Sequence, residues 1–226
     1  MSGKFAARFF LIILFSLIGS FSVFALECWE VITQDTFMAE DLLNCPYYGI
    51  EIDADNITLD CQGHTISGRF NGSGVVVFES SGHLFEGVKI RNCVVQNFTH
   101  GVAFGGNYGE ISNNILQNNN YNGLTFLGSD SVISGNTLRN NDQSGDGISG
   151  YGLKIRAGVY MGKSRRNVIS GNIIENNEHG VSLEDDVLDN SFLNNMVTNN
   201  NISGFRIQKQ VINNIFTIVL TIISYC

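Results

Sequence analysis

The sequence predicts an all-β protein, a right-handed parallel β-helix solenoid of about six to seven coils with a short N-terminal cap. Three observations support this prediction. Asn and Gly are abundant, an Asn-containing segment recurs about every 22 residues, and the apolar residues within each segment alternate with a period of two. No single segment could bury its apolar side alone, whereas stacked coils bury a continuous core.

The composition excludes several classes of protein. The 226 residues include 27 Asn, 25 Gly and one Pro, and because Asn and Gly oppose long helices, an all-α bundle is excluded. Apolar residues make up 43% of the chain and charged residues 15%, so the chain is not disordered. The net charge of −8 repels phosphates, and we therefore expect no nucleic-acid partner.

Residues 1–25 have the pattern of an export signal. Lys4 and Arg8 precede an apolar run over residues 9–24, and Val23 and Ala25 stand at the −3 and −1 positions of a cleavage site. We therefore expect a secreted or cell-surface protein. The alternative is an uncleaved signal that anchors the protein in a membrane.

Export also permits disulfide bonds. Cys28 and Cys45 would close a short N-terminal loop. Cys61 and Cys93 would join neighbouring coils, but the two cysteines are one residue out of register, which weakens this pairing. Cys226 has no evident partner.

Each repeat ends in an Asn-rich corner that is followed by Gly-apolar-x-apolar. The corner asparagines are Asn97, Asn118, Asn140, Asn176 and Asn199. In stacked coils ~4.8 Å apart these amides would lie above one another, each donating to one neighbour and accepting from the other. The step between Asn140 and Asn176 is 36 residues. Aligning Gly152-Leu-Lys-Ile155 with the other motifs places two seven-residue loops in that coil, before Gly152 and after Ile155.

The two ends of the solenoid are less regular. Thr36–Asn44 has helical character and is expected to form the end cap. Near the C-terminus, Thr217–Ile223 could be a last strand with an open edge, a docking edge or the end of a truncated gene. The expected division is an export signal over 1–25, a cap over 26–48, repeats over 49–218 and a tail over 219–226.

Gly49–Gly68 reads Gly-Ile-Glu-Ile-Asp-Ala-Asp-Asn-Ile-Thr-Leu-Asp-Cys-Gln-Gly-His-Thr-Ile-Ser-Gly and precedes rungs of the form Ile-Ser-Gly-Asn-x-x-x-Asn-Asn. Over residues 27–218 this pattern resembles the exported right-handed β-helix proteins of prokaryotes. These are grouped as NosD-type or carbohydrate-binding-and-sugar-hydrolase (CASH) repeats of the pectin-lyase-like superfamily. The resemblance implies the fold but no single activity, because that superfamily includes lyases, hydrolases, epimerases and adhesins.

The catalytic sets of that superfamily do not match this sequence. Polygalacturonase-like members carry a paired Asp, Gly-His-Gly and Arg-Ile-Lys in that order. Here His179-Gly180 precedes Asp185-Asp186, and Lys154-Ile155-Arg156 is reversed and upstream. The sequence also lacks the Asp-Pro-His-Glu run of alginate-epimerase-like members. We therefore name no catalytic residue.

The coil with the insertions is the predicted ligand-binding surface, because loops on a rigid scaffold commonly carry sites. Bases of this coil would face acids of the next, and two tyrosines offer rings on which a sugar could stack. These residues are Tyr151, Lys154, Arg156, Tyr160, Lys163, Arg165, Arg166, Glu184, Asp185 and Asp186, with Asp189 beside them. The alternative is charge pairing, in which Arg156 lies directly below Glu184 as Lys89 lies below Glu110.

We expect a secreted or cell-surface module that binds a glycan or an envelope polysaccharide, or that is structural. The alternative is a polysaccharide lyase, hydrolase or epimerase acting on acidic glycans. Further coils or another chain could stack on the edge at Ile215–Ile223. Asp53, Asp55 and Asp60 could supply oxygen ligands to Ca²⁺, and no other metal or cofactor is expected because the four histidines are scattered.

Overall fold

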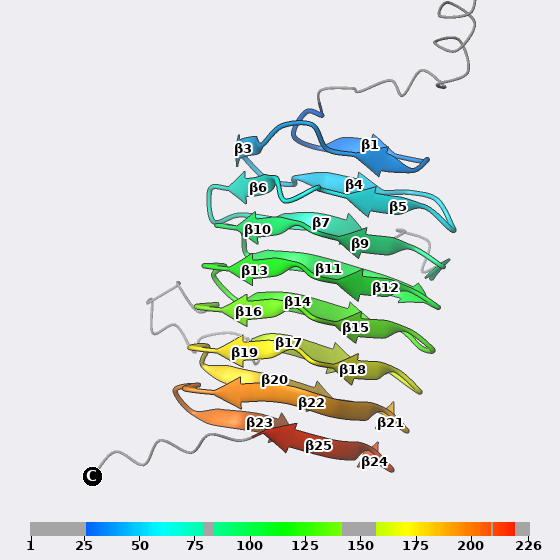
Figure 1. The fold of residues 1–226 in the computed structure, drawn as a ribbon, viewed down its shortest axis with the longest axis vertical. Coiled ribbons are helices and arrows are strands. Elements are labelled where there is room, and N and C mark those ends of the chain that lie inside the picture. Colours follow the sequence, from blue (N-terminus) through cyan, green and yellow to red (C-terminus); the bar gives the residue numbers. More distant parts are fainter. Residues whose placement is uncertain (1–25, 79–83, 142–156, 209, 220–226) are drawn as a thin grey trace, which may run out of the picture.

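The computed structural model describes residues 26–78, 84–141, 157–208 and 210–219. They form a parallel β-helix of about seven coils around one core, stacked from β1 at the N-terminal end to β24 and β25 at the other (Figure 1). No helix occurs among these residues, and none of them forms a helix long and apolar enough to cross a membrane. Each coil contributes strands to three faces, which we number in chain order.

Face 1 follows the order β1-β4-β7-β11-β14-β17-β20-β23. Its strands are β1 (Glu30–Ile32), β4 (Ile50–Ile52), β7 (Ser73–Val77), β11 (His100–Asn107), β14 (Asn122–Leu127), β17 (Ala157–Gly162), β20 (His179–Glu184) and β23 (Ser203–Ile207). The short strand β8 (Phe85–Glu86) pairs with the end of β11, and β21 (Val187–Leu188) pairs with β24 (Val211–Ile212).

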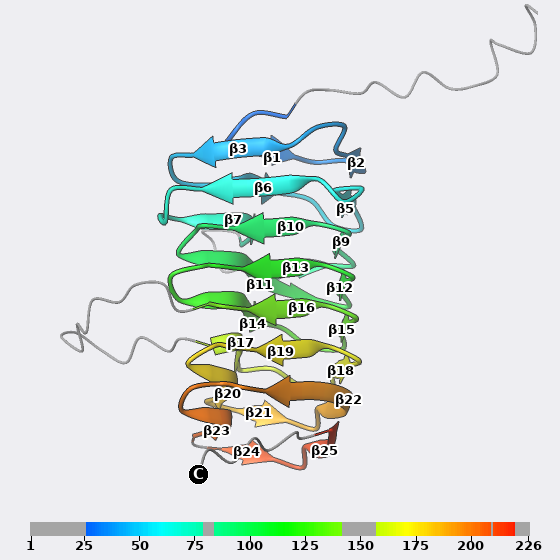
Figure 2. The same ribbon diagram turned by 60° about the vertical axis from the view of Figure 1, so that its left-hand side comes forward.

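Faces 2 and 3 form one continuous sheet because β22 (Ser191–Thr198) runs through both. Face 2 contains β2 (Thr36–Phe37), β5 (Thr58–Asp60), β9 (Lys89–Arg91), β12 (Glu110–Ser112), β15 (Val132–Ser134), β18 (Val168–Ser170) and β25 (Ile215–Val219). Face 3, seen in Figure 2, contains β3 (Leu42–Cys45), β6 (Thr65–Gly68), β10 (Val94–Gln96), β13 (Ile115–Gln117), β16 (Thr137–Arg139) and β19 (Ile173–Glu175).

The helical cap expected over Thr36–Asn44 is wrong. These residues form β2 and β3, which pair in parallel with β5 and β6 of the next coil. Strand pairing along a sheet that already exists outweighs a weak local helical preference. Residues 26–48 therefore form the first coil of the solenoid.

The core consists of columns of apolar side chains, one from each coil. On face 1, Phe104 and Phe126 occupy equivalent positions, and their rings stack with centroids 5.4 Å apart. Between the columns, glycine brings the coils close together. A Cβ atom on Gly180 would lie 2.5 Å from the carbonyl oxygen of Gly204, which explains the glycine of the Gly-apolar-x-apolar motif.

Three ladders of asparagine amides, buried except for Asn200 and Asn214 at their ends, follow the corners. In each ladder the Nδ2 atom of one Asn donates to the Oδ1 atom of the Asn in the next coil, at 2.8–3.1 Å. The same Oδ1 atom also accepts from a backbone N–H, so that buried groups are satisfied. The ladders are Asn114–Asn136–Asn172–Asn195, Asn119–Asn141–Asn177–Asn200 and Asn167–Asn190–Asn214.

The corner asparagines predicted from the repeat do not themselves form a ladder. Asn97, Asn118, Asn140, Asn176 and Asn199 have φ angles of 53° to 62°, a left-handed conformation that Asn tolerates. In four of these five corners the following residue is the buried ladder Asn. The first Asn of each pair therefore turns the chain, and the second joins the coils.

The predicted arrangement of two seven-residue loops in the long coil is also wrong. Val159 pairs with Val181 and Met161 with Leu183, so the motif of this coil is Gly158-Val-Tyr-Met161 rather than Gly152-Leu-Lys-Ile155. Almost all extra residues therefore precede Gly158, and residues 142–156 lie outside the described part of the chain. Both segments read Gly-apolar-x-apolar, and the pattern alone does not distinguish them.

Two disulfide bonds lie in the first coils, and both predicted pairs are confirmed: Cys28–Cys45 within the first coil and Cys61–Cys93 between coils. The offset between Cys61 and Cys93 is real. Asp60 pairs with Arg91 and Thr65 with Val94, which makes five residue steps on one side and three on the other. The longer corner brings the Cα atoms of the two cysteines to 4.7 Å. Cys226 lies outside the described residues.

Candidate functional site

The structure brings together the described residues of the predicted binding surface. Lys163, Arg165 and Arg166 follow β17, and Asp185 and Asp186 follow β20 in the next coil. The backbone N–H of Lys163 donates to the carbonyl oxygen of Asp185 at 2.7 Å. The three basic side chains and that of Asp185 are exposed.

The placement of four residues in that surface stays a prediction. Tyr151, Lys154 and Arg156 lie outside the described residues. Only the backbone of Tyr160 is described, and it pairs with Ser182 of the next coil.

Two carboxylates in this region are engaged by arginines. Arg166 donates from Nε and Nη2 to the two carboxylate oxygens of Asp130, at 2.7 and 2.6 Å. These hydrogen bonds lower the pKa of Asp130 and raise the pKa of Arg166. Glu184, only 8% exposed, forms an ion pair with Arg206 of the following coil. The arrangement joins coils by charge, as the alternative interpretation of the sequence expects.

The particular pair expected for Glu184 is nevertheless wrong. Because β17 begins at Ala157, Gly162 and not Arg156 lies opposite Glu184. The misplacement follows directly from the misaligned glycine motif. By contrast, Lys89 lies opposite Glu110, as predicted.

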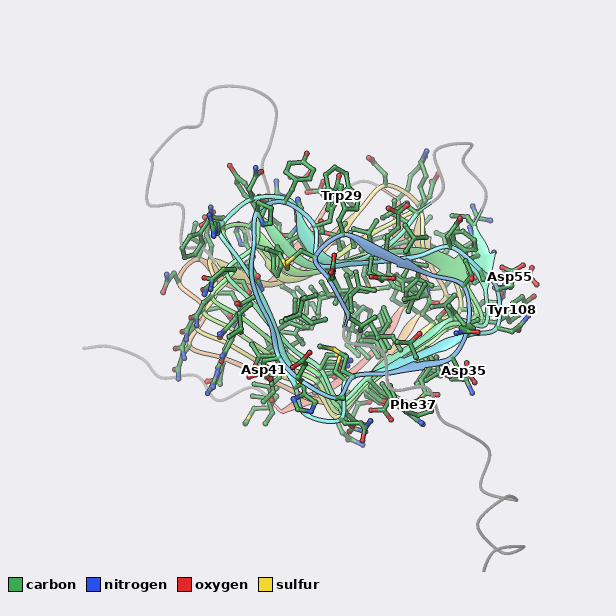
Figure 3. The ribbon with its side chains drawn as sticks, turned by 90° about the horizontal axis from the view of Figure 1, so that it is seen from above. Trp29, Asp35, Phe37, Asp41, Asp55 and Tyr108 are labelled. Atoms are coloured by element: carbon green, nitrogen blue, oxygen red, sulfur yellow. A yellow bond between two sulfur atoms is a disulfide. The ribbon has the colours of Figure 1, made fainter. Side chains whose placement is uncertain are left out.

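A cluster of three aromatic rings that the sequence did not predict lies at the N-terminal end of face 1, two of them exposed and one half-buried. The ring of Trp29 lies 5.9 Å from that of Tyr47 and 5.5 Å from that of Tyr48, and the two tyrosine rings are 4.4 Å apart. Trp29 is 56% exposed and Tyr47 40%. Figure 3 shows Trp29 on one side of the solenoid, with Phe37 on the other. We call Trp29, Tyr47 and Tyr48 the aromatic cluster.

The backbone of Trp29 is held in an unusual conformation. Its φ angle is 71°, a left-handed conformation that costs about 1–3 kcal/mol for a bulky residue. The Trp29 N–H donates to the carbonyl oxygen of Gly49 at 2.7 Å, and the neighbouring Cys28 is bonded to Cys45. The backbone that carries the exposed Trp29 ring is thus held in place. The available signal in the sequence was that these aromatic residues flank two cysteines expected to form a disulfide.

A negative charge lies near the cluster. Burial, with the hydrogen bond and charge of Tyr47 and the charge of Glu51, raises the pKa of Tyr48. Glu51 is the central residue of β4, and Phe70, 48% exposed, lies at the corner after β6. The cluster therefore combines ring faces, phenolic hydroxyls and a nearby carboxylate.

A shallow depression of about 430 Å³ lies at the corner between faces 2 and 3. It is lined by Gln62, Gly63, Asn92, Cys93, Val94, Asn113 and Ile115. At its edge, Arg91 Nε donates to Asp60 Oδ2 at 2.9 Å. Burial raises the pKa of the Asp60 carboxyl, but hydrogen bonds from Asn92, Gln62 and Arg91 outweigh this and hold the pKa below its usual value.

Comparison with known proteins assigns the fold. The family model described as right-handed beta helix region matches residues 48–219. The chain belongs to this family. The match confirms the predicted handedness of the β-helix. No curated protein matches the sequence at a significant level.

Two solved structures are similar to this β-helix. One is the enzymatically active domain of tailspike protein 2 of bacteriophage CBA120, with a TM-score of 0.49, 13% identity, and coverage of 81% of this chain and 38% of that one. The other is full-length tailspike protein 2 from Escherichia coli O157:H7 bacteriophage CAB120, with a TM-score of 0.50, 12% identity, and coverage of 81% and 34%. The β-helix spans little more than a third of those chains, and the likeness concerns the fold alone.

Two of the three aspartates considered for Ca²⁺ have other partners in the β-helix. Asp60 bonds to Arg91 and Asn92, and Asp55 Oδ1 accepts from the backbone N–H of Glu86 at 2.8 Å. Within the described ranges, no group of three or more His, Cys, Asp or Glu residues could hold a metal ion. The calcium site stays a prediction.

Proposed function

We propose that the protein is an exported module that binds carbohydrate without converting it, with the aromatic cluster as the binding platform. The proposal depends on one observation: an exposed Trp29, held in a left-handed conformation, packs against two tyrosines. The apolar C–H face of a sugar ring stacks on an aromatic face, because the negative ring face attracts hydrogen atoms of slightly positive charge. Rings already fixed in place lose little conformational entropy on binding.

The charge of the molecule supports a sugar over other partners. A net charge of −8 and the carboxylate of Glu51 beside the cluster repel anionic lipids and nucleic-acid phosphates. A sugar carries hydroxyl groups that can bond to carboxylate and phenol groups without a charge of its own. An exposed apolar patch with a polar border is a common feature of binding sites.

Two further features support export and the absence of turnover. The two disulfides favour an oxidising compartment outside the cytosol, in agreement with the signal expected over residues 1–25. A lyase or hydrolase needs a carboxylate placed to transfer a proton. Of the acids of the predicted binding surface, Glu184 is instead bound to Arg206, and the neighbouring Asp130 is bound to Arg166.

The chain offers a direct test, because Trp29 is its single tryptophan. Titration with cellohexaose, maltohexaose, chitohexaose and hexagalacturonate should give a saturable change in tryptophan emission for at least one of them, without release of reducing ends. Trp29→Gly keeps the left-handed backbone and should raise Kd at least about tenfold in calorimetry. Phe37→Ala, on another side of the solenoid, is the matched control. No saturable change with any of these oligosaccharides, or equal losses in both variants, would overturn the proposal.

A further inference from the structure

The depression at the corner between faces 2 and 3 has the chemistry of a second binding subsite. We propose that it binds one sugar ring of a neutral glycan chain that crosses face 3 and stacks on the aromatic cluster at the other side. This inference rests on the proposed carbohydrate function and specifies the chemistry and the path of the ligand.

The walls of the depression present hydrogen-bond acceptors. Gln62 Nε2 donates to the carbonyl oxygen of Met38 at 3.1 Å, and Asn92 Nδ2 donates to Asp60 Oδ1 at 3.0 Å. One N–H of each of these two amides is thus used within the protein, and the amide oxygens stay available for a ligand hydroxyl. The exposed Asn113 amide makes no hydrogen bond to the described part of the chain. A ligand rich in hydroxyl donors fits these groups.

The charges at the edge select against acidic sugars. Asp60 is ionised at neutral pH, because its hydrogen bonds lower its pKa. Arg91 is the base at this edge, and its Nε is bonded to Asp60. The Asp60 carboxylate would therefore repel a uronate, and the Arg91 guanidinium, already paired with Asp60, would not offset this repulsion. A neutral sugar avoids this repulsion.

The apolar lining fits the C–H face of a sugar ring. Val94 and Ile115 are direct partners in the β10–β13 pairing, so their half-buried side chains lie side by side on the outer surface of face 3. A volume of about 430 Å³ falls in the ordinary range of small-molecule sites, roughly 300–1,000 Å³. The combination of a flat apolar strip with amide walls suits a pyranose ring.

One strand connects this depression with the aromatic cluster. Gly63, which lines the depression, precedes β6, and Phe70 follows it. A Cβ atom on Gly72 would lie 2.1 Å from the carbonyl oxygen of Tyr47, so the end of this segment adjoins the cluster. The seven steps from Gly63 to Phe70 span at most about 23 Å at ~3.3 Å per residue. Face 3, seen in Figure 2, is therefore short enough for one oligosaccharide to reach both sites.

The column of left-handed corner residues supplies variants that preserve the backbone. Asn92, Asn113 and Asn194 share their corner position with Gly135 and Gly171, whose φ angles are 64° and 61°. Glycine is therefore accepted at this position in the fold. Asn113→Gly, alone and combined with Asn92→Gly, removes amides of the depression. Asn194→Gly makes the same change far from it and is the matched control.

Calorimetry with cellohexaose, maltohexaose, cellobiose and maltose tests the proposal. We expect the double variant to raise the Kd of the bound hexasaccharide about tenfold, as the loss of one or two hydrogen bonds predicts. The Asn194→Gly variant should bind the hexasaccharide like the wild type. The corresponding disaccharide should bind the wild type and the double variant with the same Kd, because the aromatic cluster alone holds it.

Each contrary result identifies what has failed. If the double variant binds the hexasaccharide like the wild type while Trp29→Gly does not, the depression is no subsite, and the proposed function stands. If only the double variant loses binding, the path to the aromatic cluster is wrong, and so is that platform. If the wild type binds neither neutral hexasaccharide, both this inference and its premise of a neutral glycan ligand are overturned.

Discussion

The N-terminal coils and the later coils join their neighbours by different means at the same corner. Between faces 2 and 3, Cys93 occupies the position that Asn114, Asn136, Asn172 and Asn195 occupy in later coils. Cys93 is bonded covalently to Cys61, whereas the asparagines are joined by amide hydrogen bonds. The two systems meet directly, since the backbone N–H of Cys93 donates to Asn114 Oδ1 at 2.9 Å.

The difference shows what each device requires. An amide ladder needs coils of equal geometry, because a hydrogen bond weakens quickly with distance and angle. The corners at Cys61 and Cys93 differ in length, and a covalent bridge accommodates this difference. The first coils are therefore free to be irregular. The aromatic cluster lies there, and the depression extends from these coils to Asn113 and Ile115 beside the first ladder Asn. The later coils provide a regular scaffold.

The largest loss of stability should follow removal of the bridge between coils. Cys61 and Cys93 are 32 residues apart, and opening a loop of this length costs about 3–4 kcal/mol of unfolding free energy by chain entropy. We expect this loss for Cys61→Ala/Cys93→Ala in denaturant unfolding. Cys61→Ala/Cys93→Asn should recover about 1 kcal/mol, because the new amide extends the ladder by one coil. Equal stabilities of the two variants would show that an amide cannot replace the bridge here.

A slightly smaller loss should follow from breaking a ladder in the regular coils. Asn119 Oδ1 accepts from the buried backbone N–H of Phe98 at 3.0 Å, and Asn119→Leu leaves this donor unsatisfied. We expect a decrease of roughly 2–3 kcal/mol in unfolding free energy. The adjacent Asn118 has a φ angle of 55°, and Asn118→Gly should cost far less because glycine accepts this conformation. Similar losses in the two variants would contradict the division of roles within each Asn pair.

The regular coils account for most of what could be predicted from the sequence. A repeat of nearly constant length makes the fold and the stacking of its coils visible without coordinates. Two errors come from similar motifs: the ladder Asn is one residue later than predicted, and Gly158 replaces Gly152, six residues earlier, because both segments satisfy the same pattern. The grouping as NosD-type or CASH repeats stays a prediction beyond the family shown.

The candidate site was much less predictable because its residues come from irregular corners. Trp29 and Tyr47 are 18 positions apart in the sequence, and nothing in the repeat aligns them. Their contact depends on the left-handed backbone at Trp29 and on the Cys28–Cys45 bond. Asn92 and Asn113 belong to the repeat, yet the depression they line arises from the longer corner at Gln62 and Gly63.

The next largest effect is expected from His100 on β11, between the N-terminal coils and the later coils. Its protonation should make the unfolding free energy depend on pH. Burial lowers its pKa to about 4, so the folded state disfavours the charged ring, and the unfolded state binds the proton first. The resulting stability is present above pH 6.5 and is lost as the pH falls toward 4. Between pH 6.5 and 4.5 the loss from this group should be about 2 kcal/mol.

The variant His100→Asn isolates this effect from the other groups that titrate in acid. The paired residue in the next coil is Asn122, so an Asn fits this column. The decrease in unfolding free energy between pH 6.5 and 4.5 should be smaller in the variant than in the wild type by the same amount. Parallel pH profiles would show that the His100 imidazole is not responsible.

The smallest effect is expected for the exposed ion pair between later coils. Asp130 and Arg166 form a bidentate pair at the surface, where water and salt screen the attraction. Asp130 has a φ angle of 57°, which Asn also tolerates, so Asp130→Asn removes the charge without straining the corner. We expect the melting temperature to change little and to respond less to salt than in the wild type. A loss of unfolding free energy as large as that of Asn119→Leu would mean that surface charge, rather than the buried amides, joins the regular coils.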